Sequence, residues 1–270
     1  MSFIHLLRKT INITSSGIPK LHVLQHWEFL VLSSRYICSE PKEHRFSVTY
    51  LINKCGLSPE SAFSASRYVN FETPDKADSV LALFENYGFS KTQIGILVKG
   101  LPQVLSSDPA KTLLPKLEFF RSRCVSTTDI TKIFCYNPGL LKRSLEKHII
   151  PSFNILKELL KSEEKTIASI KRFGKILLID LDTFFVPNIN VLREYGVPES
   201  KIITLIHYQP RSIAGKTHIF RENVEEVKKM GFNPLRLKFV LAVYALRTMS
   251  RSTWDTKFKV YKDGVGLRKI

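Results

Sequence analysis

The run LPQVL at residues 101–105 returns as NPGLL at residues 137–141 and as QPRSI at residues 209–213. The prolines of these runs stand 36 residues apart and then twice that distance apart. The intermediate copy is FGKIL at residues 173–177, in which Gly174 takes the place of the proline. A fixed period of this length indicates a solenoid of stacked supersecondary units.

Two further markers follow the same step along the chain. A second proline series consists of Pro115, Pro151 and Pro187. A third series marks where each unit restarts, and its members are Gly88-Phe89-Ser90, Cys124-Val125-Ser126, Leu160-Lys161-Ser162 and Gly196-Val197-Pro198. Because three independent markers share one period, we interpret the repeat as structural.

Apolar positions within one unit predict two helices. The first helical face is expected at spacings of three and four, and its residues are Ile94, Leu97, Val98, Ile130, Ile133, Phe134, Thr166, Ser169, Ile170, Ile202, Leu205 and Ile206. The second face pairs residues three apart, namely Leu117 with Phe120, Phe153 with Leu156 and Ile189 with Leu192. Prolines of the second series stand near the start of this second helix, where a missing N–H costs little.

An apolar pair between the two helices predicts a short helical turn in each unit. These pairs are Val104-Leu105, Leu140-Leu141 and Ile176-Leu177. One unit therefore reads helix, proline break, short turn, helix. Sustained alternation with a period of two is absent, so we predict an all-α solenoid without a sheet.

Composition limits the classes of protein that remain. The chain has 270 residues and a net charge of +17, from 41 basic and 24 acidic residues. Such an excess favours a polyanionic partner. The four cysteines show no paired spacing, so a disulfide framework is not expected. The apolar run Phe239–Leu246 is far too short to span a bilayer, so we expect no membrane partner.

The two ends of the chain differ from the repeat. Residues 1–40 contain Arg8 and Lys9 beside leucines, and no acidic residue precedes Glu28. This pattern predicts an organelle transit peptide, for the mitochondrion or alternatively the chloroplast. The repeats are expected over residues 46–263, and residues 264–270 are expected to form a truncated or irregular tail.

The units resemble those of the mitochondrial transcription termination factor (mTERF) family. The resemblance covers residues 46–262 and rests on the proline breaks, the restart motif and the runs DPAKTLLPKLEFF, GVPESKI and STWDTKFKVYK. These runs are similar to those of land-plant members. The resemblance implies a left-handed superhelix of three-helix units, nucleic-acid binding along a basic groove, and residence in an organelle.

Basic residues recur near the proline of successive units and predict a stripe for phosphates. The candidates are Lys142, Arg143, Lys147, Lys171, Arg172, Lys175, Arg211 and Lys216. Aromatic residues just before the prolines are candidates for base stacking, and these are Tyr136, Phe173 and Tyr208. A solvated face and core plugs are the alternative interpretations of these two sets.

The short stretches that resemble enzyme motifs are each incomplete. Gly215-Lys216-Thr217 lacks the glycine and the preceding strand that a phosphate-binding loop needs. The histidines and cysteines lack zinc-ligand spacing, and Asp180 with Asp182 is interpreted as a helix cap. We therefore expect neither an enzyme nor a cofactor, metal or small-molecule substrate.

The sequence favours a monomeric organellar protein that binds double-stranded DNA and regulates transcription, including its termination. Two alternatives stay open. The first is binding of organellar RNA in intron splicing or ribosomal RNA maturation, and the second is a protein-interaction scaffold for an acidic partner.

Overall fold

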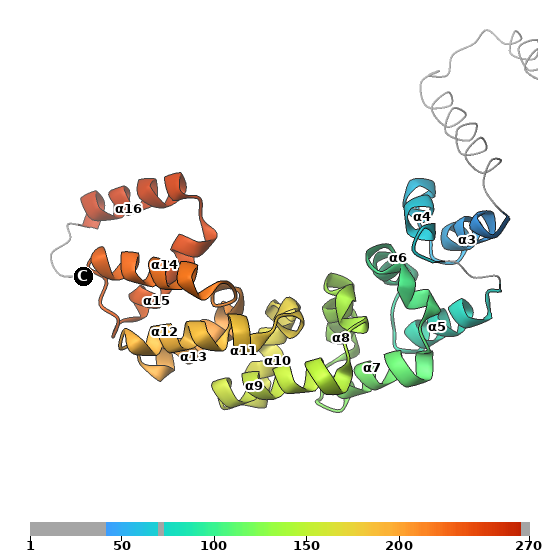
Figure 1. Cartoon of the computed structure of the whole chain (residues 1–270), viewed down its shortest axis with the longest axis horizontal. Coiled ribbons are helices and arrows are strands. Elements are labelled where there is room, and N and C mark those ends of the chain that lie inside the picture. Colours follow the sequence, from blue (N-terminus) through green and yellow to red (C-terminus); the bar gives the residue numbers. More distant parts are fainter. Residues whose placement is uncertain (1–41, 70–72, 266–270) are drawn as a thin grey trace, which may run out of the picture.

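The computed structural model describes residues 42–69 and 73–265, and the predicted transit peptide lies outside these ranges. Within them the chain forms α-helices joined by short 3-10 and π-helical turns, and it contains no β-strand. The prediction of an all-α chain of stacked helical units is confirmed. Figure 1 shows the units following one another along a curved row.

The first helices of successive units form an inner row, in which each helix packs against the next. Figure 1 places α6 and α8 of this row on the inner side of the curve, opposite α7 and α9. The row consists of α4 (Pro59–Ser66), α6 (Lys91–Gly100), α8 (Thr127–Tyr136), α10 (Glu163–Arg172), α13 (Glu199–Tyr208) and α15 (Leu237–Thr248).

The second helices form an outer row that covers the apolar side of the inner one. They are α5 (Asp75–Asn86), α7 (Leu114–Arg121), α9 (Ile150–Leu160), α12 (Val186–Glu194), α14 (Thr217–Lys229) and α16 (Arg251–Val265). A further helix, α3 (Lys42–Asn53), packs against α4 at the N-terminal end.

The predicted short turns between the two helices are present as 3-10 helices, in the order η1 (Pro102–Ser106), η3 (Pro138–Leu141), η5 (Gly174–Leu178) and η6 (Pro210–Ser212). The apolar pairs of η1, η3 and η5 are at most 3% exposed. They therefore plug the space between neighbouring units, as the sequence predicted.

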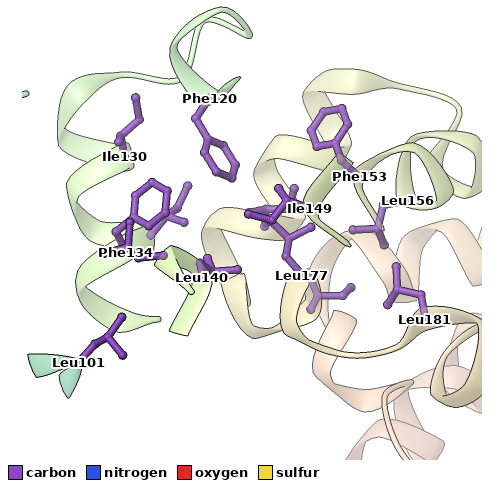
Figure 2. Packing of buried hydrophobic residues seen from close by; sticks show 14 of the residues in the cluster. Leu101, Phe120, Ile130, Phe134, Leu140, Ile149, Phe153, Leu156, Leu177 and Leu181 are labelled. Carbon is purple, nitrogen blue, oxygen red and sulfur yellow. The ribbon is translucent and has the colours of Figure 1, made fainter. Parts of the chain in front are cut away.

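The core is one continuous cluster that runs through the units. All predicted positions of both helical faces are buried. The polar residues Thr166 and Ser169 are buried as well, and each hydroxyl is satisfied because it donates a hydrogen bond to a backbone carbonyl. Figure 2 shows Phe134 and Leu140 packed beside Ile149. Edge-on aromatic contacts, such as Phe120 with Phe134 at 5.6 Å between ring centroids, add to the burial.

Units restart through a residue in the left-handed region, and in three of them a serine then caps the next inner helix. Gly88 has a φ of +78° and Gly196 a φ of +75°, whereas Cys124 adopts +57° with a side chain. Ser90 forms a capping box with Gln93, and Ser126 and Ser162 cap α8 and α10 through their hydroxyls. The restart motif therefore reflects a backbone requirement that recurs in each unit.

The second helices α7, α9 and α12 each begin one residue before a proline of the second series, as the sequence predicted. Pro115 and Pro151 are the second residues of α7 and α9, but a π-helical turn precedes each helix, η2 (Pro109–Leu113) and η4 (Leu145–Ile149). In the third unit a short helix, α11 (Leu181–Phe184), takes this place before α12. A π turn has room for a proline ring that would clash in a regular α-helix.

Candidate nucleic-acid interface

The repeat holds equivalent backbone positions in the same conformation. The residue before each 3-10 turn closes the inner helix with φ between −151° and −137° and ψ between 55° and 75°, and these residues are Leu101, Asn137, Phe173 and Gln209. In three of the four units the next residue is a proline, which disfavours the α-helical region at the residue before it and so ends the inner helix there. Side chains at equal positions of successive units consequently leave the backbone at equivalent places.

Five of the predicted basic residues lie on one repeated feature, which we call the basic edge. It comprises the last turn of an inner helix together with the adjoining 3-10 turn, and its members are Lys142, Lys171, Arg172, Lys175 and Arg211. All five are exposed. The turns η3 and η5 contact each other, so the edge continues from one unit to the next.

The remaining three predicted cations lie beside this edge. Lys147 is exposed in η4, and Lys216 is exposed at the start of α14. Arg143 is half-buried, and its Nη2 donates to the carbonyl oxygen of Leu178 in the next unit at 2.8 Å. The guanidinium of Arg143 therefore joins two units.

The exposed cations differ in how far they are already engaged. Lys171 pairs with Asp129 at 2.7 Å, and this contact holds the pKa of the Asp129 carboxyl below its ordinary value. Arg172 donates to the carbonyl of His207 at 3.2 Å. Across the described ranges, Lys142, Lys147, Lys175, Arg211 and Lys216 form no ion pair with an acidic residue. Their charge remains available to a polyanion.

The three aromatic candidates have different surroundings. Tyr136 is 78% exposed, and Tyr208 is 56% exposed. The guanidinium of Arg172 lies 5.2 Å from the centre of the Tyr208 ring, which holds that ring beside a cation. Phe173 is instead half-buried and packs against the core. Two of the candidates thus present a ring to solvent, and stacking on a base stays a prediction for them.

Acidic residues are missing from the part of each unit that forms the basic edge. Residues 130–145, 165–179 and 200–221 carry lysine and arginine but neither aspartate nor glutamate. These ranges include further cations on the inner row that the sequence analysis did not select, namely Lys132, Lys165 and Lys201. The lack of acidic residues in the same part of each repeat is the sequence signal that would have identified these three lysines.

Several basic residues of the outer row differ from those of the edge, because they have acidic partners. Examples are Arg121 with Glu118, Lys157 with Glu163, Arg193 with Glu199 and Arg221 with Glu194. Exposed pairs of this kind contribute little to stability. They offset the charge of these particular cations, whereas Lys142, Lys175 and Arg211 of the basic edge have no such partner in the described ranges.

Buried polar side chains of the outer row hold the turns that carry the basic edge. Lys116 is 5% exposed, and its Nζ donates to the carbonyl of Leu141 at 2.6 Å; burial lowers the pKa of this amine. At the equivalent position two units later, Asn188 donates to the carbonyls of Ile213 and Gly215. Neither role was predictable from the sequence, since a lysine or an asparagine is normally expected on the surface.

Other classes of site find no support in the part of the chain that the structure covers. There, no three His, Cys, Asp or Glu side chains are grouped as a metal site would require. No helix within the described ranges has the length and apolar character needed to cross a membrane. Asp180 accepts a hydrogen bond from the Thr183 amide, which confirms its interpretation as a helix cap.

Comparison with known protein families identifies a relationship that covers most of the chain. The chain matches the mTERF family over residues 81–269, which includes every unit that carries the basic edge. No curated protein matches the chain.

Proposed function

Because this chain belongs to the mTERF family of nucleic-acid-binding helical-repeat proteins, we propose that it binds double-stranded DNA and regulates organellar transcription, including its termination. The observation that carries this proposal is the basic edge, a row of exposed cations of which, in the described ranges, Lys142, Lys175 and Arg211 form no ion pair. Lysine and arginine in such a row neutralise phosphates and release the counterions condensed on the nucleic acid.

The arrangement of the units supports binding along a chain of phosphates. Each of three successive units contributes at least one cation to the edge, Lys175 and Arg211 at equivalent positions, and the units follow a curved path (Figure 1). A polyanion lying along the inner row would meet cations in one unit after another. Contacts of this kind fix position and give affinity, whereas sequence would be read by other contacts.

The exposed tyrosines favour RNA as the alternative ligand. Tyr136 and Tyr208 occupy the same position two units apart, and each presents a ring to solvent beside the basic edge. Rings in this position stack on the unpaired bases of single strands, which is the usual way that proteins recognise RNA loops. This second candidate function would place the protein in intron splicing or ribosomal RNA maturation.

Competition binding tests the proposal. Labelled duplex DNA is bound to the full chain and displaced by unlabelled duplex DNA, single-stranded RNA or heparin. Our proposal predicts that duplex DNA displaces the label best and that affinity falls steeply with salt. Preferential displacement by RNA would favour the second candidate. Weak binding of both nucleic acids, with little dependence on salt, would contradict both and favour a scaffold for an acidic protein.

Localisation and assembly are part of the same proposal. We place the protein in the mitochondrion, with the chloroplast as the alternative, and expect it to act as a monomer. A fluorescent protein fused after residues 1–45 should enter the organelle. A fusion that stays in the cytosol would contradict the transit-peptide prediction.

A further inference from the structure

A hollow of about 500 Å³ lies at the C-terminal end of the basic edge. It is lined by the two residues that flank η5 and by residues of η6, α11, α15 and the segment after η6, and its walls include Phe173, Phe184, Arg211, Gly215 and Arg247. Two guanidinium groups and two aromatic rings therefore line the same hollow. The sequence analysis selected Arg211 but not Arg247, which comes from the next unit.

Arg247 carries a charge that the protein itself leaves incompletely satisfied. Its Nη2 donates to the carbonyl of Ala214 at 2.8 Å, and its guanidinium lies 5.5 Å from the ring centre of Phe220. Its Nη1 is buried and has no hydrogen-bond partner, and no acidic residue in the described ranges pairs with this side chain. A buried charge without a counter-charge is costly, so an anion bound here would stabilise the site.

The backbone beside Arg247 keeps this space open. Gly215 has a φ of +142°, and a Cβ built on it would lie 3.0 Å from Nη2 of Arg247. The Gly215 amide donates to the carbonyl of Phe184, and its own carbonyl accepts from Asn188. The glycine is therefore held in a conformation that a side chain would strain, next to the unsatisfied guanidinium.

Arg211 supplies a second positive group at the rim. It is exposed and forms no ion pair in the described part of the chain. Guanidinium groups bind phosphate through two parallel N–H donors, which makes arginine the preferred side chain for such contacts.

We propose that this hollow is a phosphate-binding subsite in which Arg247 and Arg211 hold one phosphate group. The inference rests on the proposed function if that phosphate belongs to the bound nucleic acid. The same chemistry would accept free inorganic phosphate, so the two sources are separated by experiment. No bond forms or breaks in this step, which is binding alone.

Inorganic phosphate is the probe for the first measurement. The full chain is labelled with ¹⁵N and titrated with phosphate, and the amide signal of Gly215 is followed. We expect a saturable shift in the wild type and at least a tenfold weaker one in Arg211→Gln and Arg247→Lys. Lys157→Gln on the outer row is the matched control and should titrate like the wild type. A Gly215 signal that does not move, or that moves equally in Arg211→Gln, overturns the subsite.

Duplex DNA is the probe for the second measurement. If its phosphate occupies the hollow, Arg211→Gln lowers the slope of log affinity against log salt by about 0.9, the value for one lost phosphate contact. If DNA binding depends on salt but Arg211→Gln leaves the slope unchanged, the phosphate in the hollow does not come from the nucleic acid. If the phosphate titration also shows no binding, the subsite is refuted and the proposed function alone remains. Phosphate binding in the hollow without any DNA binding leaves the subsite standing and removes the proposed function. Arg211 is exposed, so Arg211→Gln should keep the wild-type unfolding midpoint. A change in DNA or phosphate binding by this variant is then not caused by misfolding.

Discussion

Replacing Gly174 by alanine tests why one unit has a glycine where the others have a proline. A Cβ on Gly174 would lie 2.4 Å from Nδ2 and 3.1 Å from Cγ of Asn137 in the preceding unit. Asn137 is 8% exposed and its Nδ2 donates to the carbonyl of Ile133 at 2.8 Å. The new methyl group therefore has to displace a buried amide that is already hydrogen-bonded.

The expected loss follows from that displacement. A buried donor deprived of its partner costs about 1–3 kcal/mol, whereas alanine in place of glycine returns up to about 1 kcal/mol through the unfolded chain. We expect Gly174→Ala to lower the free energy of unfolding by about 1–2 kcal/mol. The loss should vanish in an Asn137→Ala background, because no side-chain amide is then left to clash with the new methyl group. The Ile133 carbonyl still accepts a hydrogen bond from the backbone N–H of residue 137 in that background.

Urea denaturation followed by far-UV circular dichroism measures the four variants of this double-mutant cycle. Gly139→Ala in the neighbouring turn is the matched control, since its Cβ would meet only Leu178 at an ordinary 3.6 Å. It should be neutral or stabilising. An alanine at 174 that costs nothing, or that costs the same with and without Asn137, would refute the reasoning.

Three further predictions concern local features of the units. Cys124→Gly and Lys161→Gly should each raise the free energy of unfolding by about 0.5 kcal/mol, because both residues have positive φ; a lower unfolding midpoint would contradict this. Iodoacetamide near pH 8 should modify exposed Cys124, whereas Cys55, whose thiol pKa burial raises to about 12, should react only on unfolding, as read by mass spectrometry. The lowered pKa of Asp129 makes its pair with Lys171 stabilising at neutral pH and lost on acidification through that pKa. Lys171→Met should therefore reduce stability at pH 7 and leave it unchanged near pH 2, as measured by urea midpoints.

The sequence allowed the units, their two helices and the short turns to be predicted, because each marker coincides with a backbone requirement. Gly88 and Gly196 stand where φ is positive, and the apolar pair of each turn is buried. The prolines of the second series correctly predicted where the second helix begins, but not the π turn that precedes it. A π turn before Pro115 leaves no sequence signature, since it depends on how the ring fits the preceding carbonyls.

The candidate site was predictable in its charge and less so in its geometry. The repeat phase predicted that Lys175 and Arg211 occupy equivalent places. The roles of Arg143 and Lys116 were not predictable, because each donates to a carbonyl in another unit, 35 and 25 residues away respectively. Arg247 is a similar case, because its partner carbonyl lies 33 residues earlier in the chain.

The salt dependence of duplex binding tests the central claim most directly. The affected variant neutralises one cation of the basic edge in each of three units, Lys142→Gln, Lys175→Gln and Arg211→Gln. Its control makes the same change of charge on the outer row, with Arg121→Gln, Lys157→Gln and Arg193→Gln. We predict that the edge variant loses about 2.7 from the slope of log affinity against log salt, while the control keeps the wild-type slope. Equal slopes in the two variants would contradict the claim that the edge holds the phosphates.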